Sequence, residues 1–493
     1  MFWIYVFKEI FMKESSLNVP QKLGFKKKLG YSIGQMGDSI GFNVFQFFFL
    51  FFLTDIAGVP PAIAGTISLI GVLWDAITDP ICGFVSDNLR TKWGRRRPLM
   101  LASSIPYAVC TFLLFHNIDM DSSAKCIYFI IMAMLFWTAY TMYVIPYFAL
   151  GAELTQDYEE RNSLRSWASV FIYLAVMLAS ATPPLIVSQV EKMGGSTIDG
   201  WNTVGILFGA LIFIVIVICC ISTKGGEIYS DYQKEKKEKE EENRGEKVNI
   251  FKNFVEIFKL KPTKSLAATV FIWSFVSAMY NAMLVYLMTN NLGYSAGLQS
   301  TYFFLMSAIA IVQVPFINYA ANKWGKKGTY IGTTLFSGIG FIVFLFIGFP
   351  SFAFMIVYAV VVMLGTTTYW TLYYSMMYDI SEVDEFVNGK RREGSITSIM
   401  SFSQKLGSAV ALQAVGIFLQ MGGYDASLEV QSESALQAIM QLNTLVPGII
   451  GVLGAVVMFA YPLTGERFEK LKAALEAKKK GEEYTTEGFE KLL

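Results

Sequence analysis

The chain has 493 residues, of which 54% are hydrophobic and only 16% are charged. Soluble domains are typically about 45–50% apolar and about 25% charged, so this composition excludes an ordinary soluble enzyme. The 40 basic and 39 acidic residues nearly cancel, and no polyanionic partner such as a nucleic acid is indicated. The apolar surplus is instead enough for roughly a dozen membrane spans of about 20 residues each.

Twelve apolar stretches of membrane-spanning length follow one another along the chain. Backbone groups in hydrocarbon must form their hydrogen bonds within the protein, so only helices or a closed barrel can span it. Continuous runs such as VFQFFFLFFL lack the two-residue alternation of barrel strands. The sequence therefore predicts an all-α membrane protein with twelve transmembrane helices, at 31–53, 60–85, 99–116, 126–150, 167–189, 203–222, 265–288, 298–320, 328–348, 352–378, 394–421 and 443–463.

The basic residues lie almost entirely on one side of this arrangement. Lys125 and Lys192 are on the opposite side, and Lys405 falls inside a span. Because cytoplasmic loops carry the excess of Lys and Arg, both termini and the central loop are expected in the cytoplasm, with the protein in the inner (plasma) membrane. The first twenty residues have neither a basic start nor a small-residue cleavage site, so a cleaved signal peptide is not expected.

A Trp-Gly pair recurs in two loops, at Trp93-Gly94 and at Trp324-Gly325, and both are followed by basic residues. The recurrence predicts two six-helix halves of parallel topology, with the substrate between them near the membrane midplane. The expected organisation is a cytoplasmic N-terminal segment 1–30, an N-terminal half 31–222, a charged cytoplasmic linker 223–264, a C-terminal half 265–463 and a cytoplasmic tail 464–493.

The loop GFVSDNLRTKWGRRRP has two interpretations. Its basic residues are typical of a cytoplasmic anchor that only fixes orientation. Alternatively the loop is a gate, in which Asp87 at a helix end pairs with Arg90 or Arg95 across the loop and latches the cytoplasmic side. The glycines that flank these charges favour the gate.

Charged side chains inside spans cost about 2.5–3.5 kcal/mol even on a mild scale and are functional by default. Asp75 and Asp79 are four residues apart, so both carboxylates lie on one face of span two. Held close together, they must share a proton, bind a cation or pair with Lys405. Oxygen ligands suit Na⁺, and the hydroxyl groups of Thr78 and Thr141 are available to complete such a site.

Longer motifs carry a family resemblance. WDAITDP, KWGRRRP, IPYFALGAELTQDYEERNSL and YDISEVDEFVNGKRREGSITSIMSFSQKLGSA occur in this order between about Gly30 and Leu463. The pattern GxxxDxxxxxxGRRR with twelve spans resembles the major facilitator superfamily. More narrowly, the motifs resemble the glycoside–pentoside–hexuronide:cation symporter family, which includes the melibiose permeases. The resemblance implies two six-helix halves with the major facilitator fold.

The resemblance also implies site residues. Asp75, Asp79 and Thr141 match the family's cation site, and Lys405 matches a lysine at its central cavity. Sugars present hydroxyls to carboxylates and amides, and their C–H faces pack on aromatic rings. The corresponding substrate-binding candidates are Trp370, which matches a family tryptophan that faces the sugar, Asp38 in the polar cluster of span one, and Tyr140, Phe148 and Asn43.

The chain departs from the melibiose-permease branch at two positions. That branch has an aspartate two residues before the IP of span four and an arginine early in span five, where this chain has Val144 and Ser169. Neither a galactoside substrate nor the Na⁺ preference of that branch is therefore transferred to this chain.

We therefore expect a cation-coupled secondary transporter, not an enzyme, that functions as a monomer without a cofactor. It would carry a glycoside, pentoside or hexuronide inward with Na⁺ or H⁺. The alternatives are a carrier of lysophospholipids or other amphiphiles, favoured by the Phe-rich first span, a polytopic membrane enzyme that uses Asp75 and Asp79 as an acid–base pair, and a ligand sensor. The short loops on the outer side argue against the enzyme.

Overall fold

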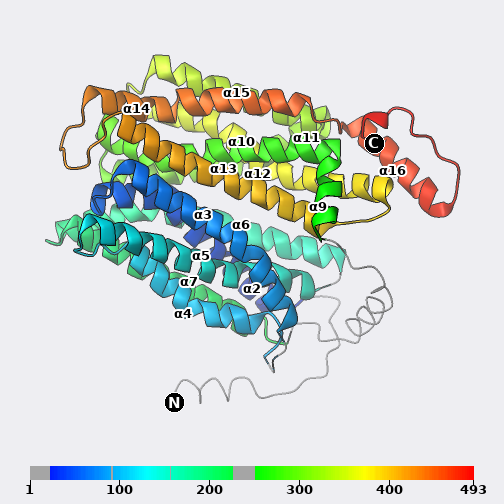
Figure 1. Ribbon diagram of the computed structural model, residues 1–493, viewed down its shortest axis with the longest axis horizontal. Coiled ribbons are helices and arrows are strands. Elements are labelled where there is room, and N and C mark those ends of the chain that lie inside the picture. The colour runs from blue at the N-terminus through cyan, green and yellow to red at the C-terminus, as the bar shows by residue number, and fades with distance from the viewer. Residues whose placement is uncertain (1–22, 90, 92, 156, 226–249, 493) are drawn as a thin grey trace.

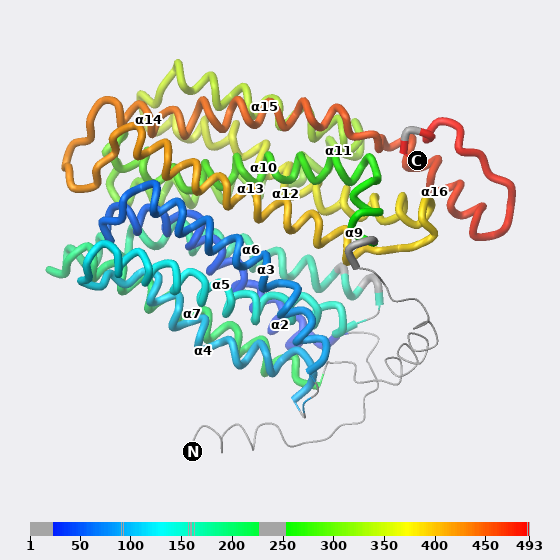
Figure 2. Tube along the Cα trace, viewed as in Figure 1, coloured from blue at the N-terminus to red at the C-terminus, as the bar shows by residue number. Residues whose placement is uncertain are grey.

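The computed structural model describes residues 23–89, 91, 93–155, 157–225 and 250–492 (Figures 1 and 2). The expected N-terminal segment up to residue 22, residue Arg90 and most of the charged linker lie outside these ranges. Within them the chain forms helices, and a lone β-bridge joins Thr91 to Gly94.

The N-terminal half contains six spans. Span one is α2 (Phe25–Val44), which continues through two π-helical turns (Phe45–Phe49 and Phe52–Ile56). The other five are α3 (Pro61–Asn88), α4 (Arg97–Leu114), α5 (Ser122–Glu153), α6 (Tyr158–Lys192) and α7 (Thr197–Ser222).

The C-terminal half repeats this arrangement and is preceded by the short helix α9 (Ile250–Lys259). Its spans are α10 (Lys261–Tyr286, extended by a π-helical turn Leu287–Asn291), α11 (Ala296–Ile347), α12 (Phe352–Asn388), α13 (Glu393–Met421) and the pair α14 (Glu433–Asn443) and α15 (Leu445–Phe459). Helix α16 (Gly465–Lys480) follows the last span.

Ten helices in the described part of the chain are long and apolar enough to cross a membrane. Two more spans complete the predicted twelve. The 52 residues of α11 contain two helices that meet at Gly325, and span one is interrupted by its π-helical turns. The halves lie one above the other in Figure 1, with α2 to α7 below and α10 to α15 above. This arrangement confirms the predicted fold class.

The repeated Trp-Gly pair has a structural reason. Gly94 and Gly325 both have positive φ, at 101° and 78°, a region that residues with a Cβ rarely adopt. At each position the chain reverses between two spans within a few residues. The tryptophans beside them, Trp93 and Trp324, are 39% and 66% exposed, as is typical of aromatic residues at a membrane interface.

Four glycines spaced along one face of α2 let this helix approach its neighbours closely. A Cβ at Gly41 would lie 1.7 Å from the hydroxyl oxygen of Tyr107, and one at Gly34 would lie 2.7 Å from a cysteine sulfur of α7. Small residues permit such contacts where no hydrophobic effect drives helices together. Tyr107 and Tyr143 also donate hydrogen bonds to the carbonyls of Gly37 and Gly34, at 3.0 and 2.5 Å. Span one is thereby fixed around its polar residues.

The bundle has two distinct ends. We call the end with loops 93–96 and 389–392 and helices α9 and α16 the linker end, and the end with loops 57–60, 115–121 and 292–295 the far end (right and left in Figure 1). The two halves contact each other along α3 with α13 and along α6 with α11.

Toward the far end this contact is tight. A Cβ at Gly416 of α13 would lie 2.2 Å from the carbonyl oxygen of Pro61, and Gly65 of α3 lies beside Gly416. Thr54 at the end of span one shares a 2.6 Å hydrogen bond with Tyr286 of α10, and Tyr424 donates a 2.5 Å hydrogen bond to Asp55. These contacts join the halves directly.

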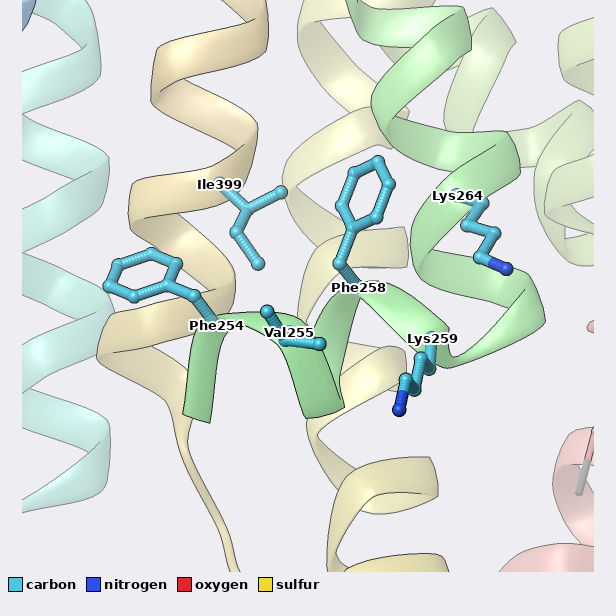
Figure 3. A pocket seen from close by; sticks show the side chains of 6 residues that line it. All are labelled: Phe254, Val255, Phe258, Lys259, Lys264 and Ile399. Carbon is cyan, nitrogen blue, oxygen red and sulfur yellow. The ribbon is translucent and has the colours of Figure 1, made fainter. Parts of the chain in front are cut away.

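At the linker end, Arg392 ties α9 to the C-terminal half. Its guanidinium pairs with the buried Asp384 at 2.6 Å and with Glu256 of α9 at 2.7 Å, and it donates to the side chain of Asn253. Helix α9 lies within the segment that the sequence predicted as a linker. Its apolar side chains and Ile399 form a surface pocket of about 440 Å³ with Lys259 and Lys264 at one side (Figure 3).

Candidate functional site

Three charged side chains meet between the two halves at the middle of the bundle. The Lys405 ammonium of α13 lies 2.6 Å from a carboxylate oxygen of Asp75 and 2.5 Å from one of Asp79, both on α3. Asp75 is 1% exposed, and both acids lie on one face because they are four residues apart. Of the three alternatives for this acid pair, the structure contains the pairing with Lys405. One ammonium opposite two carboxylates leaves one negative charge unbalanced.

Two threonine hydroxyls complete this group, which we call the ion-pair cluster (Asp75, Asp79, Lys405, Thr78 and Thr141). Thr141 of α5 donates a 2.5 Å hydrogen bond to the second carboxylate oxygen of Asp75. Thr78 shares a 3.2 Å hydrogen bond with Thr141 and donates to the backbone carbonyl of Asp75. Carboxylate and hydroxyl oxygens from two helices therefore converge, which is the ligand chemistry that hard cations prefer.

Asp38 lies at the centre of a second polar group on span one. Tyr140 of α5 donates a 2.6 Å hydrogen bond to one of its carboxylate oxygens, and Gln35 donates a 2.6 Å hydrogen bond to the other. Both partners are neutral, and no ion pair to this carboxylate is found among the described residues. A carboxylate in this state can accept further hydrogen bonds from the hydroxyls of a ligand.

The two groups are linked electrostatically, since the charge of Lys405 also acts on Asp38. Gln404, next to Lys405, accepts a 3.2 Å hydrogen bond from Tyr373 of α12. The ring of Trp370 packs against those of Tyr369 and Tyr373 and is half-buried. Trp370 is therefore one aromatic neighbour away from the residue that precedes Lys405.

Two candidates lie apart from Asp38. The amide of Asn43 donates to the backbone carbonyl of Ser39 in its own helix, at 2.7 Å. The ring of Phe148 is half-buried, and the Arg165 guanidinium of α6 lies over it at 5.7 Å from its centroid. The hydrogen bond within its own helix leaves the amide of Asn43 fewer donors for a ligand. Arg165, which lies over Phe148, is a charged residue that the sequence did not single out.

The loop with the predicted gate forms ion pairs within one half. Asp87 pairs with Arg95 at 2.9 Å and with Arg96 at 2.6 Å, and Arg96 continues to Glu153 of α5 at 2.8 Å. Arg90, the third gate candidate, lies outside the described residues. These pairs fix the α3–α4 loop against α5, and none of them reaches the C-terminal half.

Sequence reasoning missed several ion pairs at the linker end. Lys326, directly after the second Trp-Gly pair, lies 2.6 Å from Asp379 of α12, much as Arg96 pairs with Glu153 in the other half. Each repeated loop is thus held by a basic residue to an acid at the end of a neighbouring span. The repeat itself, together with acidic starts in loops after spans four and ten, was the signal available for these pairs.

Comparison with known proteins agrees with the fold. The MFS/sugar transport protein family matches residues 30–465, which is most of the chain. The chain belongs to this family of membrane transporters, and it is a multi-pass membrane protein.

Individual relatives extend over nearly the full chain. An uncharacterized symporter of Bacillus subtilis (strain 168) is 30% identical, over 95% of this chain and 99% of its own. The glucuronide carrier protein homolog of Escherichia coli (strain K12) is 26% identical over 93% and 97%, and the isoprimeverose transporter of Lactiplantibacillus pentosus is 27% identical over 92% of both. The solved structure of the E. coli xylose transporter XylE has the same fold, with a TM-score of 0.64 at 13% identity over 90% of this chain and 98% of that one.

Proposed function

We propose that this protein is a secondary active transporter that moves a glycoside, pentoside or hexuronide together with Na⁺ or H⁺ by alternating access. The carrying observation is the ion-pair cluster, in which one lysine of the C-terminal half bridges two carboxylates of the N-terminal half. The cluster lies on the surface along which the halves would move apart. The symporter, carrier and transporter names of the relatives support the same activity.

The charge balance of the ion-pair cluster would couple cation binding to sugar transport. The cluster holds two carboxylates and one ammonium, so binding of one Na⁺ or one proton makes it neutral. A neutral cluster costs less to move through the low-dielectric interior than a charged one, which favours reorientation of the loaded carrier. Because the charge of Lys405 also acts on Asp38, cation binding changes the field at the proposed sugar site. Each ligand then affects the affinity for the other.

Asp38 and Tyr140 would bind sugar hydroxyls, with Trp370 and Phe148 packing on the C–H faces of the ring. The linker end, which carries most of the basic loops, would face the cytoplasm, and the protein would lie in the inner membrane. We propose that it acts as a monomer, and that it needs no cofactor beyond the coupling cation, since both proposed sites lie within one chain.

The Phe-rich first span, which favoured an amphiphile carrier, has a different role in the structure. The Phe-rich stretch of span one packs inside the protein, where Phe45 contacts Trp137 and Phe47 contacts Phe303 of the other half. Its phenylalanines at 45, 47, 48, 49 and 52 are at most 3% exposed. They are packing residues of the bundle and offer no free apolar surface to an acyl chain. No specific observation in the described part of the chain favours a membrane enzyme or a ligand sensor.

Uptake into membrane vesicles tests the proposal. A panel of labelled glycosides, pentosides and hexuronides would be offered under an imposed Na⁺ gradient and, separately, under a proton gradient. We expect one gradient to drive accumulation above the external concentration, and a matched ionophore to abolish it. Equilibration of a sugar without accumulation would exclude symport, and turnover of a sugar to a product would favour the enzyme.

A further inference from the structure

Helix α9 lies across the linker end of the spans, and part of its apolar surface is uncovered (Figure 1). Val255 is 38% and Phe258 is 49% exposed, whereas Ile257 is fully buried against the bundle. A helix that crosses the end of a span with one apolar face is typical of the membrane interface, where that face contacts lipid. The exposed side chains of α9 are therefore placed to contact the bilayer.

These side chains form part of the surface pocket of about 440 Å³ described above. Figure 3 shows Phe254, Phe258 and the nearly buried Ile399 of α13 around the same space. The volume lies within the range of roughly 300–1,000 Å³ that is usual for sites of small molecules. The pocket is thus large enough to hold part of a lipid molecule.

Lys259 and Lys264 give this apolar pocket a positive side. Both side chains are exposed, and neither pairs with a carboxylate in the part of the chain that the structure describes. The nearest acid in α9, Glu256, pairs with Arg392 at 2.7 Å. An ammonium group binds phosphate strongly as a compact point charge. Apolar walls beside two such cations are complementary to an amphiphile with an anionic head.

The pocket is a fixed part of the C-terminal half. Arg392 joins Glu256 of α9 to the buried Asp384 of α12, at 2.7 and 2.6 Å. A single residue, the buried Leu260, separates α9 from α10. Because these contacts hold α9 in place without a ligand, a molecule that binds here does not have to order the helix first.

We propose that this pocket binds one anionic phospholipid of the surrounding bilayer, with an acyl chain against Phe254 and Phe258 and the headgroup phosphate beside Lys259 and Lys264. Basic pockets next to membrane spans bind anionic headgroups in this way. A zwitterionic phospholipid has the same phosphate and the same chains, but the cation in its headgroup is repelled by the two lysines. The inference rests on the membrane fold and does not depend on the transported substrate.

Native mass spectrometry of the purified full-length protein in detergent tests the proposal. The probes are phosphatidylglycerol, phosphatidylcholine with the same acyl chains, and glycerol 3-phosphate, which has the phosphate without the chains. We expect phosphatidylglycerol to bind about tenfold to thirtyfold more tightly than phosphatidylcholine. Equal affinities would overturn the proposal. Displacement of the lipid by an equal concentration of glycerol 3-phosphate would instead assign the lysines to a soluble phosphate.

The charge variant is Lys259→Gln/Lys264→Gln, which should lower the affinity for phosphatidylglycerol to that for phosphatidylcholine. Its control, Lys323→Gln/Lys390→Gln, removes two exposed lysines of the same end outside the pocket and should leave both affinities unchanged. Equal losses in the two double variants would show that net charge alone attracts the lipid, and would overturn the pocket. Unchanged binding in the first variant would overturn it as well.

The apolar variant is Phe258→Ser, which should weaken the binding of both phospholipids because it removes the contact with the acyl chain. Val255→Ser, at a smaller exposed side chain, serves the same purpose if Phe258→Ser does not fold, as thermal unfolding in the same detergent would show. Unchanged lipid binding in the folded apolar variant would overturn the proposal. A dimer in the mass spectrum that this variant dissociates would also overturn it, in favour of a second copy of the chain.

Discussion

The ion-pair cluster and the polar group around Asp38 hold carboxylates in the same bundle in opposite ways. In the cluster, Lys405 lies within 2.6 Å of two carboxylates, and a threonine hydroxyl supports one of them. Among the described residues, Asp38 instead has two neutral hydrogen-bond donors, Tyr140 and Gln35. The carboxylates of the cluster already have a cationic partner, whereas the carboxylate of Asp38 keeps hydrogen-bonding capacity for a ligand. An ion pair between the halves can be broken and re-formed when the halves move, whereas a carboxylate without an ion pair can bind a ligand.

The largest effect should follow from loss of Lys405, because its removal leaves two adjacent carboxylates unpaired in the membrane. Lys405→Gln is expected to abolish uptake and to destabilise the protein by about 3–5 kcal/mol, the usual cost of breaking a buried pair. Thermal unfolding in detergent measures the second effect. Adding Asp75→Asn should restore much of the stability without restoring uptake, and a fully stable Lys405→Gln protein would contradict the pairing.

Removing either acid of the cluster should separate coupling from transport. Asp75→Asn and Asp79→Asn are each expected to reduce gradient-driven accumulation to simple equilibration, because a cluster with one carboxylate and one ammonium no longer needs a cation. Sugar exchange across vesicles without a gradient should persist. Asp119→Asn, which removes an exposed acid from the far-end loop, is the control. Continued accumulation in both variants would remove the cation site from the cluster.

Asp38 should matter for the sugar more than for the cation. Asp38→Asn is expected to weaken sugar binding about tenfold to a hundredfold, and Tyr140→Phe about tenfold, because hydrogen bonds to a charged group are lost or loosened. Cation affinity, measured separately by Na⁺ or proton titration, should change less. Equal losses of sugar affinity and cation affinity would show that the ion-pair cluster and the polar group around Asp38 form a single site.

A third carboxylate, Asp55 at the far end, belongs to neither region and sharpens the contrast. It accepts hydrogen bonds from Tyr424 and Thr54, both at 2.5 Å, and so helps to hold the halves together. Tyr424→Phe should change the rate of exchange a few-fold and leave equilibrium sugar affinity within about twofold, because the bond lies outside both sites. A large affinity change would show that the far end takes part in binding.

The smallest effect is expected from an ion pair at the linker end of α2 and α6, which precedes the apolar segment Ser163–Lys192 of α6. The hydrogen bond from Lys28 holds the pKa of Glu160 below its usual value of 4.5. A lowered folded pKa stabilises the protein above pH 4.5, and this contribution is lost as the pH falls through the folded pKa. Glu160→Gln should therefore lower the Tm slightly at pH 7 and hardly at all near pH 3. A Tm difference that does not depend on pH would exclude the ion pair as its cause.

The sequence predicted the fold because its signals are properties of whole segments. Apolar length defines the spans, and the repeated Trp-Gly pair marks two chain reversals that require positive φ. The candidate acids of span two were predictable for a similar reason, since a charge costs free energy wherever it lies inside a span. Their contact with Lys405, which is far away in the chain, depends on how α3 and α13 pack, and spacing alone left three alternatives.

Other site residues were concealed by their sequence context. Arg165 lies near the end of a span, where a basic residue is expected as an anchor, so its place beside Phe148 had no distinct signal. Asp55 comes three residues after a run of phenylalanines at the end of span one. Asp384 reads as part of a solvated loop, yet it is fully buried by its pairing with Arg392. In each case the neighbours in space, not in sequence, give the residue its role.

The close contact of Gly65 and Gly416 has a consequence for the energy of the transport cycle. Backbone lies against backbone there, and the described residues at this far-end part of the α3–α13 contact form hydrogen bonds but no ion pair, unlike the part that holds Lys405. Such a seam can open and become hydrated at modest cost and close again without finding a unique charge partner. The two end states can then differ by only a few kcal/mol, a gap that the binding of a single small ligand suffices to reverse.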